Sequence, residues 1–205
     1  MGKYVGGLVI ILILGAIGYY GWIYFHESGT STTPPDNSTP PAQQEEMSTY
    51  STSTFSIQYP SNYSVDAAYA YQGVPKKPIP GVKFVIPGSM ATGTNLSGFD
   101  TGVSVESLPR AQRCTGDIYI YDPVKANDMT IGSTTFSVAT TSGAGAGNFY
   151  EEHVFAVKDS KPCTAVRYFI HSTNINNYPA NTVREYDRDA LLSDFDKIRD
   201  SLQLN

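Results

Sequence analysis

The sequence lacks the residue patterns that identify common enzymes and cofactor sites. It contains no G-x-S-x-G elbow, no H-E-x-x-H helix and no EF-hand loop. It has only three histidines, and one of them, His26, directly follows an apolar N-terminal segment. Because little remains for acid/base catalysis, we expect a protein that is not an enzyme and that carries no cofactor.

Charge is also scarce, at 16% of 205 residues, and no basic cluster is present. Beyond His26 the chain has 13 basic and 19 acidic residues, a net charge of −6. A nucleic-acid partner requires a clustered basic face, so we expect none. Tyrosine, phenylalanine, serine and threonine are plentiful instead, which favours strands over long charged helices.

The segment from Val5 to Phe25 has no charged residue over 21 positions. A helix of that length measures about 30 Å, the thickness of a hydrocarbon core. Aromatic residues gather at its C-terminal end, and Lys3 lies at the other end. We therefore predict that residues 1–26 are a single-pass membrane anchor with a cytoplasmic N-terminus. A cleaved signal peptide is the alternative, but the run is long and no A-x-A-like site follows it.

The next segment, residues 27–52, is rich in serine, threonine and proline. It has too few large apolar residues to repay the entropy of ordering, so we predict a linker. Residues 53–205 then form one extracytoplasmic domain, because their length suits a single core.

Within this domain, short apolar runs alternate with turn residues, and several have the period of two that half-buried strands show. The predicted strands are 54–59, 81–86, 102–108, 134–139, 148–157 and 163–172. Five polar residues join the last two, which indicates a hairpin and an antiparallel sheet. The glycine-rich segment 142–148 lacks the Gly-Lys-Ser/Thr ending of a phosphate loop and is predicted to be a flexible connection. Residues 116–129 fit a short helix or a strand.

A C-terminal helix is predicted at 188–202, with Asp187 as its N-cap. Apolar residues recur there at helical spacing: Leu191, Phe195, Ile198 and Leu202. An apolar stripe of this kind must pack against a sheet face to be removed from water. The fold class we predict is therefore α+β, an antiparallel sheet packed by a C-terminal helix.

Two stretches carry a resemblance to a known family. TFSIQYPSNYSV, at 54–65, resembles the first strand of Mog1/PsbP-like domains, and LLSDFDKIRDSLQL, at 191–204, is similar to their last helix and short terminal strand. GNFYEEHVFAV and CTAVRYFIHSTNINNYP are similar to segments of uncharacterised membrane-anchored bacterial proteins. The resemblance implies an α/β/α or α+β sandwich with an antiparallel sheet, and it implies no activity.

The two cysteines, Cys114 and Cys163, lie 49 residues apart on the side of the membrane that we predict to be oxidising. We predict a disulfide between them, which by the chain-entropy model would contribute about 3 to 4 kcal/mol. Two buried thiols are the alternative. No CxxC redox motif occurs.

A metal site in the hairpin can be considered if Val157 pairs with Cys163. That register places the metal-ligand candidates Glu151, His153 and His171 on one face. Arg167 would lie between them and oppose a cation, so we expect a solvated face with Glu–Arg pairing and no metal.

Tyrosines offer a second candidate site, because exposed rings form sugar-binding or protein-binding surfaces. Most should be half-buried strand residues. Loops 67–80 and 173–179 are where a surface could form, so the candidates are Tyr69, Tyr71 and Tyr178.

We therefore expect a membrane-tethered extracytoplasmic interaction or structural module, whose partner would be an envelope protein or a glycan. One alternative is a glycan- or peptide-binding protein of the cell envelope, which would show exposed aromatic residues around a groove. The other is a hydrolase or metal enzyme without a recognisable motif, which would show a polar cleft converging on His153 or His171.

Overall fold

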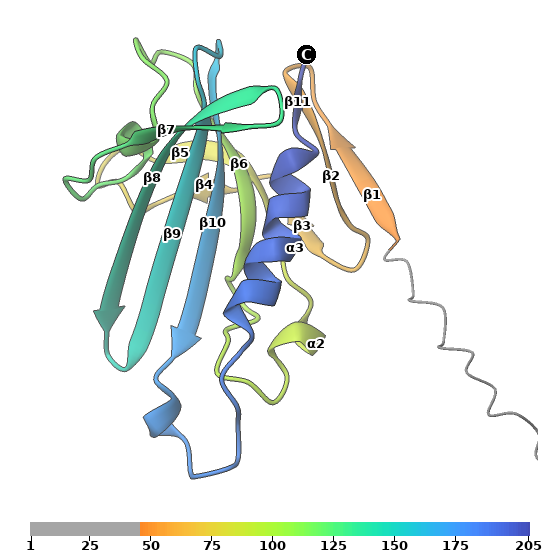
Figure 1. Ribbon diagram of the computed structural model, residues 1–205, viewed down its shortest axis with the longest axis vertical. Coiled ribbons are helices and arrows are strands. Elements are labelled where there is room, and N and C mark those ends of the chain that lie inside the picture. Colours follow the sequence, from red (N-terminus) through yellow and green to blue (C-terminus); the bar gives the residue numbers. More distant parts are fainter. Residues whose placement is uncertain (1–45) are drawn as a thin grey trace, which may run out of the picture. The chain divides into compact units, whose positions relative to one another are not determined.

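The computed structural model describes residues 46–205 (Figure 1). The predicted anchor, residues 1–26, and the predicted linker up to residue 45 lie outside the described residues. Within 46–205, no helix is both long enough and apolar enough to cross a membrane.

An eight-stranded sheet dominates the domain, and every strand pair in it is antiparallel, as predicted. Its strands, in spatial order, are β3 (Ser64–Asp66), β5 (Ile79–Val85), β6 (Gly102–Leu108), β10 (Cys163–Thr173), β9 (Asn148–Val157), β8 (Thr134–Gly145) and β7 (Asn127–Ile131). The short β4 (Ala70–Tyr71) pairs separately with β5. The predicted α+β class is confirmed.

A smaller sheet has the order β1 (Met47–Ser51), β2 (Phe55–Pro60) and β11 (Gln203–Leu204). Strand β1 therefore lies inside the predicted linker, so the linker prediction is wrong for these five residues. The run MSTYS looks like linker sequence because three of its five side chains are small and polar, but β2 supplies a partner for its backbone hydrogen bonds. The ring of Tyr50 also packs edge-on at 5.9 Å from Phe84.

Helix α3 (Arg188–Asp200) packs against β2 and β6 and covers part of one face of the large sheet (Figure 1). Its apolar stripe is buried at Leu191, Phe195 and Ile198, as predicted. The Asp187 side chain caps the helix by accepting from the backbone N–H of Ala190 at 3.0 Å. The helix ends two residues before the predicted Leu202, because the chain then turns into β11. The other helices within residues 46–205 are single turns: α2 (Gly88–Ala91), η1 (Gly116–Tyr119) and η2 (Ile175–Asn177).

The large sheet has two faces, which we name the helix face and the far face. The helix face carries the main core, which α3 and β2 cover. The far face carries a second apolar cluster, which includes Tyr119 and Ile120 from the segment that connects β6 to β7. Strand residues on the far face include Val154, Ala165 and Arg167.

Two predicted loops have more order than the sequence indicates. Segment 116–129, left open between helix and strand, contains η1 and β7. The glycine-rich segment predicted as a flexible connection is mostly strand, because β8 continues to Gly145 and β9 begins at Asn148. Ala146 and Gly147 make the turn with φ of 50° and 80°. Two residues with positive φ suit the right-handed twist of a hairpin, so the strands need no longer connection.

The predicted register of the β9–β10 hairpin is wrong by one residue. Tyr168 pairs with His153, and Arg167 pairs with Val154. A one-residue shift moves every side chain of a strand to the opposite face. The observed register buries Val154 and Ala156 on the far face and Phe155 on the helix face.

Candidate functional site

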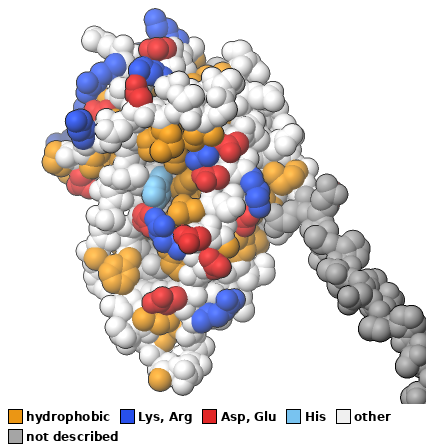
Figure 2. All heavy atoms as spheres, in the orientation of Figure 1, with side chains coloured by type: hydrophobic (Ala, Val, Ile, Leu, Met, Phe, Trp, Pro, Cys, Tyr) orange, Lys and Arg blue, Asp and Glu red, His pale blue; other side chains and the backbone are white. Residues whose placement is uncertain are grey.

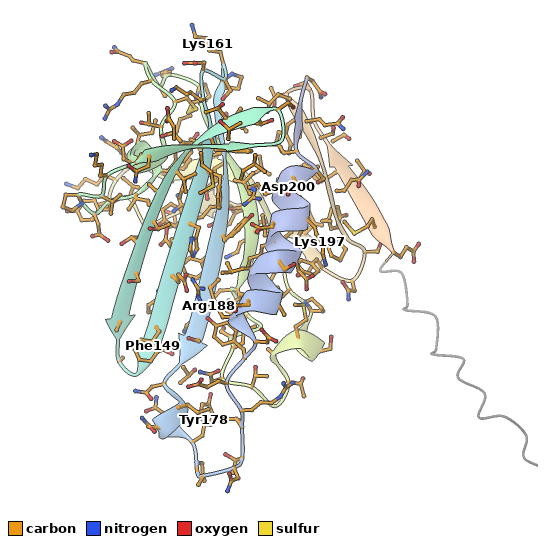
Figure 3. The ribbon with its side chains drawn as sticks, in the orientation of Figure 1. Phe149, Lys161, Tyr178, Arg188, Lys197 and Asp200 are labelled. Carbon is orange, nitrogen blue, oxygen red and sulfur yellow. A yellow bond between two sulfur atoms is a disulfide. The ribbon has the colours of Figure 1, made fainter. Side chains whose placement is uncertain are left out.

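A groove lies on the part of the helix face that α3 leaves uncovered, along β8 and β9. Two cavities of about 680 and 390 Å³ form it, and both are lined by Ser142 and Glu151. Its floor consists of three facing pairs: Thr140 with His153, Ser142 with Glu151, and Ala144 with Phe149. Figure 2 shows this face, where a histidine lies beside basic and acidic side chains. Phe149 and Arg188 lie at different edges of the groove (Figure 3).

Glu151 is the centre of the charged groups in the groove. It pairs with Arg188 through both carboxylate oxygens, one of which accepts from Nε at 3.0 Å, and with His153 Nε2 at 2.5 Å. The hydrogen bonds from Arg188, followed by those from His153, lower the pKa of the Glu151 carboxyl. Glu151 is therefore a carboxylate at neutral pH and is poorly suited to donate a proton.

This ion pair makes a pH-dependent contribution to stability. Because the pKa of Glu151 is lower in the folded chain, the contribution is present above the unfolded value of about 4.3 and is lost as pH falls through the folded value. We expect Glu151→Gln to lower the free energy of unfolding by about 1 kcal/mol at neutral pH, with a smaller difference in acid. Urea unfolding across this pH range would measure it. Glu185→Gln, at an exposed acid without such a pair, is the matched control, and an equal effect of both variants at every pH would contradict the prediction.

The cavity beside His153 is polar, which is the feature that we expect of a hydrolase. The hydroxyl residue opposite the imidazole, Thr140, is not positioned as its nucleophile. Thr140 faces His153 across the strand pair. Among the interactions of residues 46–205, no hydrogen bond joins the Thr140 hydroxyl to the imidazole. A nucleophilic hydroxyl needs such a contact with its base, and Thr140 does not make it with His153 in this structure.

The structure separates the three metal-ligand candidates. Glu151 and His153 lie on the helix face, whereas His171 lies on the far face, because the register differs from the predicted one. His171 contacts the Asp100 carboxylate through Nδ1 at 2.8 Å and Asn148 Oδ1 through Nε2 at 3.1 Å. In the described part of the chain, no cluster of three or more His, Cys, Asp or Glu side chains suits a metal ion.

Arg167 is fully buried on the far face, where the sequence indicated a solvated strand surface. Its guanidinium donates to both oxygens of Glu106, at 2.8 and 2.9 Å, and also pairs with Glu152. The backbone carbonyl of Tyr119 accepts a further bond at 2.8 Å. We call Arg167, Glu106 and Glu152 the buried ionic network. A buried arginine satisfied by two carboxylates is a structural element, and no sequence periodicity identified it.

Buried or half-buried charges of the far face account for two of the three candidate tyrosines. Tyr71 is 8% exposed, its hydroxyl donates to Glu152 at 2.8 Å, and its ring stacks at 3.5 Å from the Arg167 guanidinium. Burial raises the pKa of Tyr71. Tyr69 is half-buried beneath the Lys83 ammonium. Tyr178 follows η2 beyond the end of β10 (Figure 3). The three rings therefore do not form one exposed surface.

The most distinctive surface feature is the outer edge of β8, which the sequence did not reveal. Strand β7 pairs only with residues 134–138, and within residues 46–205 no strand pairs with that edge from Ala139 to Gly145. Hydrogen-bonding direction alternates along a strand. Because the tight turn closes on the facing pair Gly145 and Asn148, the backbone N–H and C=O groups of Thr140, Ser142 and Ala144 point outward.

Comparisons with known proteins leave the domain without a family assignment. No protein-family model and no curated protein matches the sequence. A crystal structure from Bacteroides thetaiotaomicron VPI-5482 is similar with a TM-score of 0.39 and 12% sequence identity. The match covers 74% of this chain and 45% of that chain, and we infer nothing about function from it.

Proposed function

We propose that the domain is an extracytoplasmic interaction module, tethered to the membrane by residues 1–26, that binds an extended peptide segment of an envelope protein. The observation that carries this proposal is the open edge of β8 beside a groove. A peptide that adds to a sheet edge gains affinity from main-chain hydrogen bonds, and pockets for alternate side chains give specificity.

The composition of the edge supports this use. Natural sheets protect an open edge with charged residues, proline, a bulge or a cover. The open segment of β8 reads ATTSGAG, with no charge and no proline over seven residues. Its side chains are small. The charged group beside it is Asp122, whose carboxylate accepts from the Thr141 hydroxyl at 2.9 Å.

The groove supports a peptide over a second copy of this chain. If β8 paired with β8 of another copy, only small side chains such as Thr140, Ser142 and Ala144 would reach the groove. They would leave cavities of about 680 and 390 Å³ unfilled. A peptide with long polar side chains would fill this space and reach Glu151 and Arg188, whose side chain is 46% exposed.

The glycan alternative has less support. Tyr71, one of its candidate aromatic residues, is buried against Arg167, and Tyr69 is partly covered by Lys83. Phe149, 47% exposed, is the aromatic side chain most accessible in the groove. Tyr150 and Tyr186 also line the groove but are only partly exposed, which leaves less stacking surface for a sugar.

We further propose that the fold is a Mog1/PsbP-like sandwich and that the domain faces an oxidising compartment. TFSIQYPSNYSV forms β2 and the turn after it, and the last helix is followed by a short strand that pairs with β2, which supports the first point. The disulfide between Cys114 and Cys163 supports the second, because such bonds persist mainly outside the cytoplasm.

The test of peptide binding is Ser142→Pro, compared with Ser142→Ala, in the full chain held in nanodiscs. Proline removes the outward N–H of residue 142, and such a position on an edge strand tolerates proline. Alanine keeps that N–H. An array of short peptides of random sequence is the probe, and amide hydrogen exchange reports protection at residues 140, 142 and 144.

We expect selected peptides to bind the unmodified chain and Ser142→Ala equally. Ser142→Pro should bind them at least about tenfold more weakly, a loss equivalent to about 1.4 kcal/mol. The proposal fails if no peptide binds, or if binding to Ser142→Pro is undiminished. Protection of the edge that depends on protein concentration, without any peptide, would assign it to a second copy of the chain instead.

A further inference from the structure

A separate cavity of about 690 Å³ opens where β6 ends and β10 begins, next to the disulfide. Three parts of the chain line it: residues within 74–79, residues 108–113 and Ile118 of η1. Its volume lies within the range of sites that hold one small molecule. Cys114 directly follows the 108–113 segment, so its bond to Cys163 fixes one wall of the cavity.

The floor of this cavity is apolar. Ile79 is 2% exposed and belongs to the second apolar cluster. Val74, Leu108 and Ile118 are partly buried and pack against the same cluster. A bound hydrocarbon chain would therefore extend an existing core and would be removed from water.

The polar side chains around the opening are predominantly cationic. Lys77, Arg110 and Arg113 line the cavity, and no Asp or Glu does. Arg113 donates to Asp117 at 3.1 Å. Within residues 46–205, the side chains of Lys77 and Arg110 have no hydrogen-bond or ion-pair partner. In a chain with a net charge of −5, Lys77 and Arg110 beside one apolar cavity favour an anionic group at its opening.

A closed turn at residues 74–77 holds Lys77 in place beside the cavity. Lys76 has φ of 60°, a conformation that glycine adopts more easily. The backbone N–H of Lys77 closes the turn by donating to the carbonyl of Val74 at 3.1 Å.

We propose that this cavity binds a long-chain fatty acid. The acyl chain lies against Ile79, Leu108 and Ile118, and the carboxylate lies between Lys77 and Arg110. Carboxylates match the guanidinium fork, and an ion pair with Arg110 satisfies both groups. The lining has no aromatic side chain to stack on a base and no acid to bind sugar hydroxyls, so a nucleotide fits less well. This site is separate from the groove and does not depend on peptide binding.

The test is photolabelling of the full chain in nanodiscs of neutral phosphatidylcholine, with a photoactivatable palmitate as the probe. Labelled peptides are identified by mass spectrometry, with and without excess palmitate. Arg110→Glu removes the carboxylate partner at an exposed position, and Ile118→Trp fills the cavity. Lys125→Glu, an exposed lysine outside the lining residues, makes the same charge change as Arg110→Glu and is the matched control. A photoactivatable alkylammonium of equal chain length tests the charge of the head group.

We expect palmitate-sensitive labelling within residues 74–118 of the unmodified chain and of Lys125→Glu. Labelling should fall at least about tenfold in Arg110→Glu and should be weak for the alkylammonium. Ile118→Trp should abolish it while the disulfide still forms. Equal labelling by both probes, labelling elsewhere in the chain, or no effect of Arg110→Glu would overturn the proposal. If only nanodiscs with anionic lipid recruit this surface, it is a membrane contact and the fatty-acid proposal is wrong.

Discussion

Replacing Arg167 with methionine should lower the free energy of unfolding by about 3 to 5 kcal/mol, the range observed when one partner of a buried ion pair is removed. The side chain of Arg167 and that of Glu106 are both fully buried. Without the guanidinium, the hydrogen bond that remains to Glu106 within residues 46–205 comes from the hydroxyl of Ser104 at 2.8 Å, and the nearby positive charge is that of Lys83. A buried carboxylate with so little compensation strongly disfavours the folded state.

A double-mutant cycle with Glu106→Gln is the matched control. Glutamine removes the negative charge and keeps a similar shape, so Arg167→Met with Glu106→Gln should be less destabilised than the sum of the two single changes. Urea unfolding of all four proteins gives the coupling energy. Additive effects would show that the two residues stabilise the fold independently, contrary to the geometry.

Replacing both cysteines with alanine should lower the free energy of unfolding by about 3 to 4 kcal/mol. The disulfide between Cys114 and Cys163 joins the segment after β6 to the first residue of β10, and both residues are nearly buried. Without it, the unfolded chain regains the freedom of a loop of 49 residues. Denaturant unfolding under oxidising conditions measures the change.

Reduction of the unmodified chain is the control, because it breaks the same bond without changing the sequence. The reduced protein and the double alanine variant should have similar stability. Hydrogen exchange should also increase first in residues 110–125, since the disulfide holds that segment on the far face. If the double variant is as stable as the oxidised protein, the bond contributes nothing to folding.

Local pattern was enough to predict much of this fold. Period-two runs bounded by proline or polar turns predicted β2, β5, β6, β9 and β10, because each strand buries one face and its side chains alternate. Helical spacing and Asp187 predicted α3 and its cap. The single pair of cysteines predicted the disulfide. In all these cases the information lies within a few residues or in a pairing with one solution.

The site depends on pairings that local pattern does not encode. Glu151, His153 and Arg167 were each recognised as chemically interesting, but a register error of one residue placed them on the same face. The sequence determined the α+β class, the strands, the last helix and the paired cysteines. Only the tertiary structure decided which charges are buried, which strand edge stays open and where a cavity forms. These features depend on contacts between segments far apart in the chain, and the local alternation of side chains is compatible with more than one such pairing.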